Sequence, residues 1–166
     1  ILVHSASGVV IKILLNAKEK LQRTFKVIVL KQDFTKTRQL IQALLQAGIA
    51  HEVVPEYDLI HHLPQATKLF IGAVAVTPDR NVVASAGTAG IVSQCHIGKV
   101  PVYLFVNSLK FSHQSSQNQH IHRKEEAETR DGLTYSLTTY SHSLVALQLI
   151  DHVVTATGEL KLEPAV

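Results

Sequence analysis

The chain has 166 residues, of which 46% are hydrophobic, 17% charged and 5% aromatic, and its formal charge is +3. This composition supplies the core of one ordinary domain and excludes a disordered chain, a coiled coil and, with Cys95 as the single cysteine, a disulfide scaffold. It contains no uncharged apolar run of about 18 residues, which excludes a membrane-spanning segment, and the lone thiol favours a reducing, cytoplasmic compartment.

The chain opens on Ile1–His4, an apolar segment typical of a strand end, and it contains no methionine. We therefore expect a single domain, residues 1–166, that lacks the N-terminal part of a longer protein. Residues 1–40 hold eight of the sixteen Lys and Arg residues. This excess of positive charge fits a phosphate, nucleic-acid or acidic partner, and it also fits a solvated helix face.

Apolar, strand-like runs alternate with helical periodicity through the first two thirds of the chain. Strands are predicted at Ile1–His4, Phe25–Leu30, Ile49–Val54, Leu69–Gly72 and Pro101–Val106. Helices are predicted at Val9–Leu21, from a cap at Thr35 or Thr37 through Ala47, at Tyr57–Leu63, and after Gly87–Gly90 through His96. Since these strands show no polar face, we expect a sheet covered on both sides. That arrangement is an α/β three-layer sandwich with a mainly parallel sheet.

The last third of the chain changes in composition. Residues 112–132 are polar and almost free of apolar side chains, so they predict a long, mobile polar loop. The apolar run Leu144–Ile150 predicts a helix, and Asp151–Thr155 predicts a final strand. The tail Gly158–Val166 is expected to be short and extended.

Two loops enter helices in the way that ligand-binding loops of such folds do, at the carboxyl ends of strands. Ser5–Gly8 supplies two hydroxyl groups and a glycine at a helix N-terminus, which fits an anion bound by backbone N–H groups. Simple helix capping by Ser7 explains the same residues. Gly87–Gly90 has the same placement and the same two interpretations, but it matches neither a P-loop nor a dinucleotide-binding fingerprint.

No metal or cofactor site is predicted. His113, His120 and His122 lie in the polar segment without a cysteine or an acid in register, so solvated side chains are expected. Cys95 and His96 are neighbours on a predicted helix, and their side chains point about 100° apart. They therefore do not form a nucleophile–base pair, and Cys95 is expected to be a buried structural thiol.

Five sequence blocks occur in an order that matches one known family. They are Ile1–Val10, Ile71–Val76, Gly87-Thr88 with the following helix, Pro101–Phe111 and the ending Val154–Val166. Together they resemble the C-terminal domain of the alpha/beta/delta family of eukaryotic translation initiation factor 2B. The resemblance implies a Rossmann-like fold and a missing N-terminal helical domain. It also implies a regulatory subunit of a guanine nucleotide exchange factor that dimerises and helps to bind the phosphorylated initiation factor 2.

The same superfamily includes isomerases of methylthioribose 1-phosphate and ribose 1,5-bisphosphate, which carry a catalytic Cys in the first loop and a catalytic Asp in the second. The resemblance places Ser5 at the Cys position and Val74 at the Asp position. Two further family positions, an Asn and a Lys, fall on Ala84 and Ser85. Because Val74 cannot shuttle a proton between carbons, we expect this domain to be a pseudoenzyme without isomerase activity.

The lysine of the family's SxKF segment is kept here as Lys110. With Ser5, Ser7, Gly87 and Thr88, it implies a pocket for a sugar phosphate or nucleotide, although an ordinary surface lysine also explains it. The predicted function is a non-catalytic domain for protein assembly or regulation, as a homodimer or family hetero-oligomer. The alternatives are a sugar-phosphate isomerase (aldose–ketose type) with a rearranged site and a sugar-phosphate or nucleotide sensor. Nucleic-acid binding is not expected, because no aromatic platform accompanies the basic residues.

Overall fold

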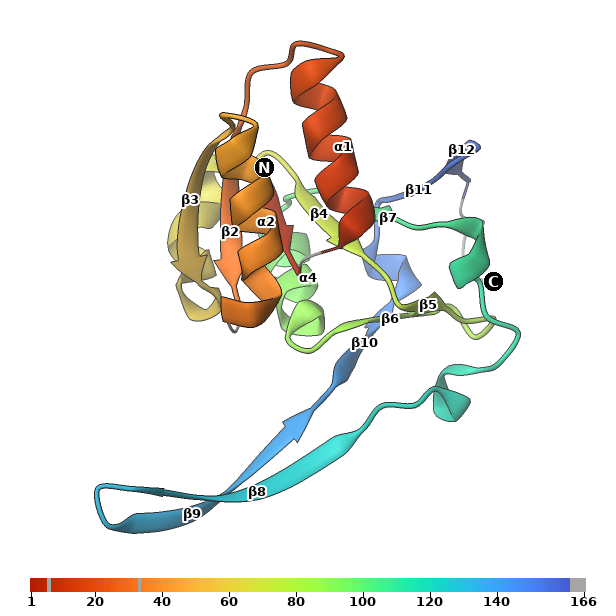
Figure 1. Ribbon diagram of the computed structural model, residues 1–166. Helices are drawn as coiled ribbons and strands as arrows, with labels where there is room; N and C mark the ends of the chain where they lie inside the picture. Colours follow the sequence, from red (N-terminus) through yellow and green to blue (C-terminus); the bar gives the residue numbers. More distant parts are fainter. Residues whose placement is uncertain (6, 33, 162–166) are drawn as a thin grey trace.

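A seven-stranded sheet forms the centre of the computed structural model, which describes residues 1–5, 7–32 and 34–161 (Figure 1). Its strand order is β12-β11-β7-β4-β1-β2-β3, and all neighbours are parallel except β12, which pairs antiparallel with β11. The strands are β1 (Leu2–His4), β2 (Lys26–Lys31), β3 (Ala50–Pro55), β4 (Leu69–Gly72), β7 (Val102–Phe105), β11 (His152–Thr155) and β12 (Gly158–Leu160). The predicted α/β fold with a mainly parallel, Rossmann-like sheet is confirmed.

Helices cover both faces of this sheet. α1 (Gly8–Glu19) and α2 (Phe34–Gln46) lie on one face, and α3 (Leu59–His62) and α4 (Thr88–Ile97) lie on the other (Figure 1). Short 3-10 helices, η1 (Glu56–Asp58) and η2 (Leu63–Gln65), flank α3, so the helix predicted at Tyr57–Leu63 is divided into three short turns. None of the helices that the structure describes is long and apolar enough to cross a membrane.

The two faces of the sheet bury two separate apolar cores. Successive side chains of a strand point to opposite faces, so Leu2 enters one core and Val3 the other. Val3 packs in the core beneath α1 with Leu14, whereas Leu2 packs in the core beneath α4 with Val92. Because both faces of the sheet are covered, the inner strands β1, β2, β4 and β7 are mainly apolar, which is why the sequence revealed them.

A small antiparallel sheet lies on the α4 side of the main sheet. It has the order β10-β6-β5 and consists of β5 (Ala75–Val76), β6 (Asn81–Ser85) and β10 (His142–Ala146). The helix predicted at Leu144–Ile150 is therefore wrong: the segment forms β10 and then the 3-10 helix η5 (Leu147–Leu149). Pairing with β6 satisfies the backbone of β10, and the burial of Val145 and Leu147 accounts for the apolar spacing that resembled a helix.

The polar segment that was predicted as a loop over 112–132 contains an ordered strand in its second half, so the prediction is wrong there. β8 (Arg123–Arg130) and β9 (Leu133–Tyr140) form an antiparallel hairpin that projects from the body (Figure 1). Its turn residues, Asp131 and Gly132, both have positive φ, at 52° and 78°. An Asp-Gly pair in this conformation is a strong hairpin signal, which outweighs the polarity of the strands.

The first half of that segment contains the 3-10 helix η4 (Ser116–Asn118), which is tied to the body through one carboxylate. The backbone N–H of Ser116 donates to Asp79 at 2.9 Å, and its hydroxyl donates to the other carboxylate oxygen. These bonds, the hydroxyl bond first, hold the pKa of Asp79 well below its usual range. Of the predicted extended tail, β12 is described, whereas residues 162–166 and Ala6 of the first loop lie outside the described residues.

Candidate functional site

A cleft of about 680 Å³ opens at the carboxyl ends of the parallel strands β1, β2, β4 and β7. It is bordered by the loops that follow these strands, by the first turns of α1 and α2 and by the 3-10 helix η3 (Ser108–Lys110). Ligands of open α/β sheets bind at this edge, because the strand order diverges there and leaves a crevice between loops.

The first loop brings two predicted residues, Ser5 and Ser7, to the cleft. Ser5 has φ 72°, a left-handed conformation that is uncommon for a residue other than glycine and costs on the order of 1–3 kcal/mol. Ser7 occupies the N-cap position of α1 but makes no side-chain capping bond, so the capping interpretation is not supported. Its side chain lies instead against Gly72, where an added Cβ would overlap with it.

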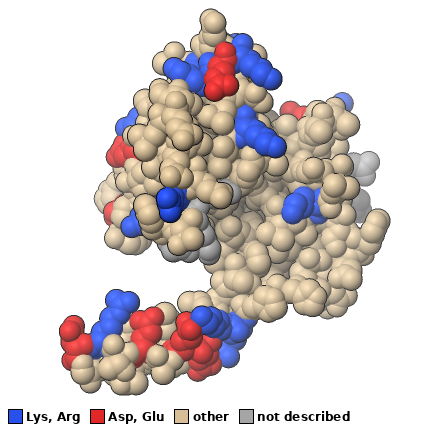
Figure 2. Space-filling model, in the orientation of Figure 1, with Lys and Arg blue, Asp and Glu red and all other residues tan. Residues whose placement is uncertain are grey.

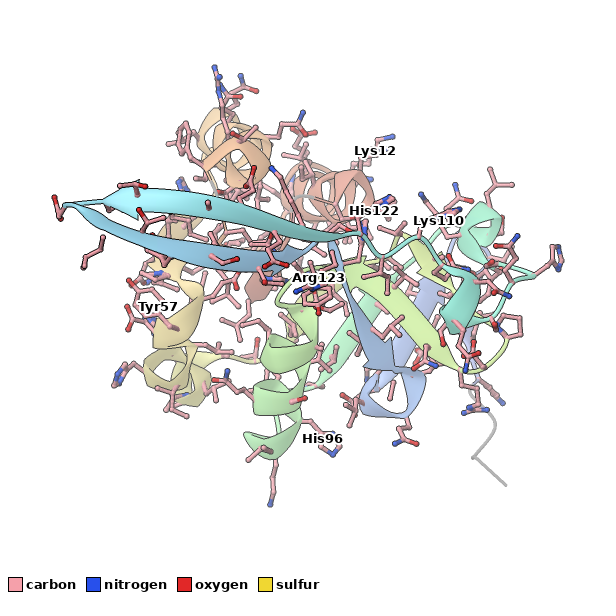
Figure 3. The ribbon with its side chains drawn as sticks, turned by 90° about the horizontal axis from the view of Figure 1, so that it is seen from below. Lys12, Tyr57, His96, Lys110, His122 and Arg123 are labelled. Carbon is pink, nitrogen blue, oxygen red and sulfur yellow. The ribbon has the colours of Figure 1, made fainter. Side chains whose placement is uncertain are left out.

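Two lysines line the cleft from different elements: Lys12 from α1 and Lys110 from η3 (Figure 3). The Oδ1 atom of Asn107 accepts the backbone N–H of Leu109 at 2.9 Å, which fixes the start of η3. The first turn of α1 carries no acidic side chain, and none of the described residues that line the cleft is an Asp or a Glu. The lysines and the helix N-terminus therefore give the cleft a positive potential that suits an anion.

The resemblance assigns Val74 to the position of the isomerases' catalytic Asp, and Ala84 and Ser85 to two further family positions. Val74 lines the cleft and is partly exposed, Ser85 also lines it, and Ala84 is buried in the core. Cys95 lies in α4 away from the cleft lining, and burial raises the pKa of its thiol to about 12. Because the thiolate is the nucleophilic form, this cysteine is the structural thiol that the sequence predicted.

Gly87 and Thr88 are the two predicted ligand residues that the structure does not bring to the cleft lining. Thr88 is buried, and its hydroxyl donates to the carbonyl of Ser85 at 2.7 Å. Gly87 has φ 85°, and the Glu56 carboxylate occupies the space that a Cβ would need. Gly87 thus lies against Glu56 of η1, whereas Thr88 contacts His4 at the end of β1.

A buried histidine organises this junction, and sequence reasoning missed it. The ring of His4 lies 2.8 Å from the Glu56 carboxylate through Nε2 and 3.0 Å from the Thr88 hydroxyl through Nδ1. The Thr88 hydroxyl also donates to the carbonyl of Ser85, so the ring of His4 joins the end of β1 to both η1 and the N-terminus of α4. A histidine that ends an apolar strand was the available signal, because a fully buried ring requires polar partners.

Sequence reasoning also missed Gln32, which follows β2 and lines the cleft. Its Nε2 atom donates to the carbonyl of Ala86 at 2.6 Å. Its Oε1 atom is buried and has no hydrogen-bond partner among the described residues. Within the same part of the chain, no three or more His, Cys, Asp or Glu side chains are grouped so as to hold a metal ion.

Comparisons with known proteins agree with this architecture. The model of the Initiation factor 2 subunit family matches residues 1–161. A translation initiation factor eIF-2B subunit 2-like protein of Pyrococcus furiosus is 32% identical over 134 residues, which cover 80% of this chain and 48% of that protein. The chain spans about half the length of the curated relatives it matches.

Solved structures show the same fold. The Pyrococcus horikoshii translation initiation factor eIF-2B superposes with a TM-score of 0.81 at 25% identity, covering 96% of this chain and 57% of that chain. A chain of the tetrameric eIF2B-beta2-delta2 complex from C. thermophilum has a TM-score of 0.72 at 20% identity, with coverages of 96% and 49%. At that lower identity the likeness concerns the fold alone.

Proposed function

The chain belongs to the Initiation factor 2 subunit family, and we propose that it is a non-catalytic domain acting in protein assembly or regulation. In this proposal the domain is cytoplasmic and keeps a cleft that binds a sugar phosphate or nucleotide. The observation that carries the proposal is the lining of the cleft, which holds lysines and hydroxyl groups suited to a phosphate. The resemblance assigns Ser5 and Val74, two residues of that lining, to the positions of the isomerases' catalytic Cys and Asp.

The phosphate part of the ligand has a matching environment. Lys12 and Lys110 supply positive charge, the hydroxyls of Ser5 and Ser7 supply donors, and the N-terminus of α1 supplies its partial positive charge. The unpartnered Oε1 of Gln32 is an acceptor on a residue of the same cleft. A sugar hydroxyl is a donor of the kind that this acceptor lacks, which favours a sugar phosphate over inorganic phosphate.

The absence of turnover follows from the chemistry of the lining. Interconversion of an aldose and a ketose moves a proton between adjacent carbons, which requires a positioned general base and acid. The described residues that line the cleft include no His, Cys, Asp, Glu or Tyr side chain. The lysines are the titratable groups that remain there, and in this proposal they hold the phosphate.

One observation favours the isomerase alternative. Ser5 stands in a strained left-handed conformation within the cleft, and strained residues concentrate at active sites. Incubation with ribose 1,5-bisphosphate followed by NMR of the products decides between the two functions. We expect unchanged substrate, and formation of a ketose would overturn the non-catalytic assignment.

Ligand binding is tested by thermal shift and calorimetry with ribose 1,5-bisphosphate and with AMP. We expect at least one of these to stabilise the chain. The variants Lys12→Ala and Lys110→Ala should lose most of that stabilisation. Lys18→Ala is the matched control, because Lys18 lies on the same helix as Lys12 but outside the cleft lining, and it should behave like the parent. No response to either ligand, or an equal loss in the control, would refute the cleft assignment.

A further inference from the structure

The β8–β9 hairpin, residues 123–140, is an arm that stands away from the body of the domain (Figures 1 and 2). Every residue of β9 is exposed, and so is nearly every residue of β8. Within the part of the chain that the structure describes, neither outer edge of the hairpin pairs with another strand. A two-stranded hairpin is marginally stable in water, and a third strand is among the additions that stabilise it.

The two strands of the arm differ in charge. β8 has the sequence RKEEAETR, in which six of the eight side chains are charged, and three ion pairs join residues two positions apart along it. β9 has the sequence LTYSLTTY and carries no charge. Charged side chains, prolines and bulges are the features that keep further strands away from an exposed edge. β9 has none of them, since it is uncharged, contains no proline and pairs with β8 without a bulge. The outer edge of β9, unlike that of β8, is therefore open to strand addition.

The hydrogen-bond pattern identifies the backbone groups that lie along this open edge. In an antiparallel pair, residues that bond to the partner strand alternate with residues whose N–H and C=O groups point away from it. The N–H of Ser141, directly after β9, donates at 2.9 Å to the carbonyl of His122, directly before β8, so Ser141 bonds to the partner strand. Alternation along the register then assigns the outward backbone groups to Thr134, Ser136, Thr138 and Tyr140.

These outward residues form a regular array that only an extended chain matches. Each supplies one N–H donor and one C=O acceptor, and the array repeats every two residues, or about 7 Å. A strand presents its own outward groups at the same interval, whereas the backbone groups of a helix interior are already paired within the helix. Addition of a strand to an exposed sheet edge is a recurring mode of peptide recognition, in which main-chain hydrogen bonds supply affinity.

The side chains of β9 indicate the composition of the added strand, because β9 would be its immediate neighbour. On one face β9 presents Leu133, Tyr135 and Leu137, while the charged side chains of that face belong to β8, on the far side from the open edge. On the other face it presents the hydroxyl groups of Thr134, Ser136 and Thr138. Cross-strand contacts therefore favour apolar residues on the first face and small β-branched or hydroxyl residues on the second.

We propose that the outer edge of β9 is a strand-addition site for an extended, uncharged segment of a partner protein, in which apolar residues alternate with threonine, serine or valine. The added segment bonds to the outward backbone groups of β9 and converts the arm into a three-stranded sheet. The inference goes beyond the proposed function, because the anion-binding cleft takes no part in it.

A synthetic peptide of the length of β9 tests the proposal. It alternates valine and threonine and carries a lysine at each end for solubility and a fluorescent label. We expect its anisotropy to rise to saturation as the chain is added up to about 1 mM, a range that covers weak interactions. Ser136→Pro should weaken this binding at least about tenfold, because the ring removes an outward donor and obstructs the added strand.

Ala127→Pro is the matched control for Ser136→Pro. Ala127 pairs with Ser136 across the arm, so its N–H points out of the opposite, charged edge. Proline is tolerated at edge positions whose N–H faces solvent, and circular dichroism checks that both variants keep the hairpin. Ala127→Pro should bind the peptide like the parent.

Amide hydrogen exchange followed by NMR tests the pairing without a substitution. In the free chain, the outward amide of Ser136 should exchange rapidly, whereas the amides of Tyr135 and Leu137 are protected by their bonds to β8. Saturation with the peptide should slow the exchange of Ser136 and Thr138 and leave the outward amide of Ala127 unchanged.

Three results would overturn the strand-addition site: no binding over the whole range, an equal loss of binding in Ala127→Pro, or unchanged exchange at Ser136 in the presence of the peptide. A change in the sedimentation of the peptide-free chain on Ser136→Pro would mean that a second copy of the chain occupies the edge, which would overturn the choice of partner. The ligand assays of the cleft do not involve the arm, so these results would leave the proposed function in place.

Discussion

Removal of the His4 ring is expected to destabilise the domain strongly, because the Thr88 hydroxyl and the Glu56 carboxylate then lose their hydrogen bonds to it. His4 is fully buried, and the side chain of its partner Glu56 is 28% exposed. A buried polar group left without its hydrogen-bond partner costs about 1–3 kcal/mol, and His4→Leu removes the partner of both Thr88 and the partly exposed Glu56, so we expect a loss of about 2–4 kcal/mol. In a chain of this size, that loss lowers the melting temperature by roughly 4–16 °C.

Urea unfolding of single and double variants measures this effect. Because replacing both partners of a buried polar contact leaves no group unsatisfied, His4→Leu combined with Glu56→Leu should be more stable than His4→Leu alone. Ser93→Ala, on the exposed side of α4, serves as a control with an effect near zero. A loss below about 1 kcal/mol for His4→Leu, or strictly additive losses in the double variant, would refute the stabilising role of the His4–Glu56 hydrogen bond.

Three further predictions address packing, pH and reactivity. Gly72→Ala should cost about 1–3 kcal/mol in urea unfolding, because the new Cβ overlaps with Ser7, and an unchanged stability would contradict that packing. The pKa of Asp79 is held low by bonds from Ser116 in the folded state, so the unfolded state binds more protons and stability falls as the pH drops below about 4. Asp79→Asn should flatten this acid-dependent loss in thermal unfolding scans, and an unchanged pH profile would argue against the contact. Cys95, with its pKa raised to about 12 by burial, should react with Ellman's reagent at pH 8 only after unfolding; rapid labelling of the native chain would show that the thiol is accessible.

The strands of the main sheet were predictable because burial on both faces imposes an unbroken apolar sequence. Leu69–Gly72 matches β4 residue for residue, and the other parallel strands differ only at their ends. The polar strand Arg123–Arg130 carried no such signal. Its backbone forms hydrogen bonds with β9, and nearly all of its side chains are exposed to solvent, so it needs no apolar residues. The Asp131-Gly132 turn was the local feature that could have revealed it.

The lining of the cleft was predictable only in part. The end of each strand locates the loop that follows it, but the direction of each side chain in that loop depends on tertiary contacts. Ser5, Ser7 and Lys110 meet at the carboxyl edge of the sheet, as expected for loops that follow parallel strands. Thr88 follows the same rule in sequence, but its hydrogen bonds to His4 and Ser85 turn it toward the core. That arrangement depends on a contact between residues 84 positions apart, which periodicity and spacing do not encode.

Lys12 lines the cleft, although sequence reasoning did not select it as a ligand residue. It stands four residues after Gly8, so both lie on the face of α1 that meets the cleft. A basic residue one turn into a helix whose first turn lacks an acid adds to the charge of the helix N-terminus. The close approach of Ser7 to Gly72 holds this end of α1 against β4. This packing requires no proton-transfer residue. The shape and charge of the cleft therefore do not depend on the groups that catalysis would need, and the proposed role as a non-catalytic anion-binding domain requires that independence.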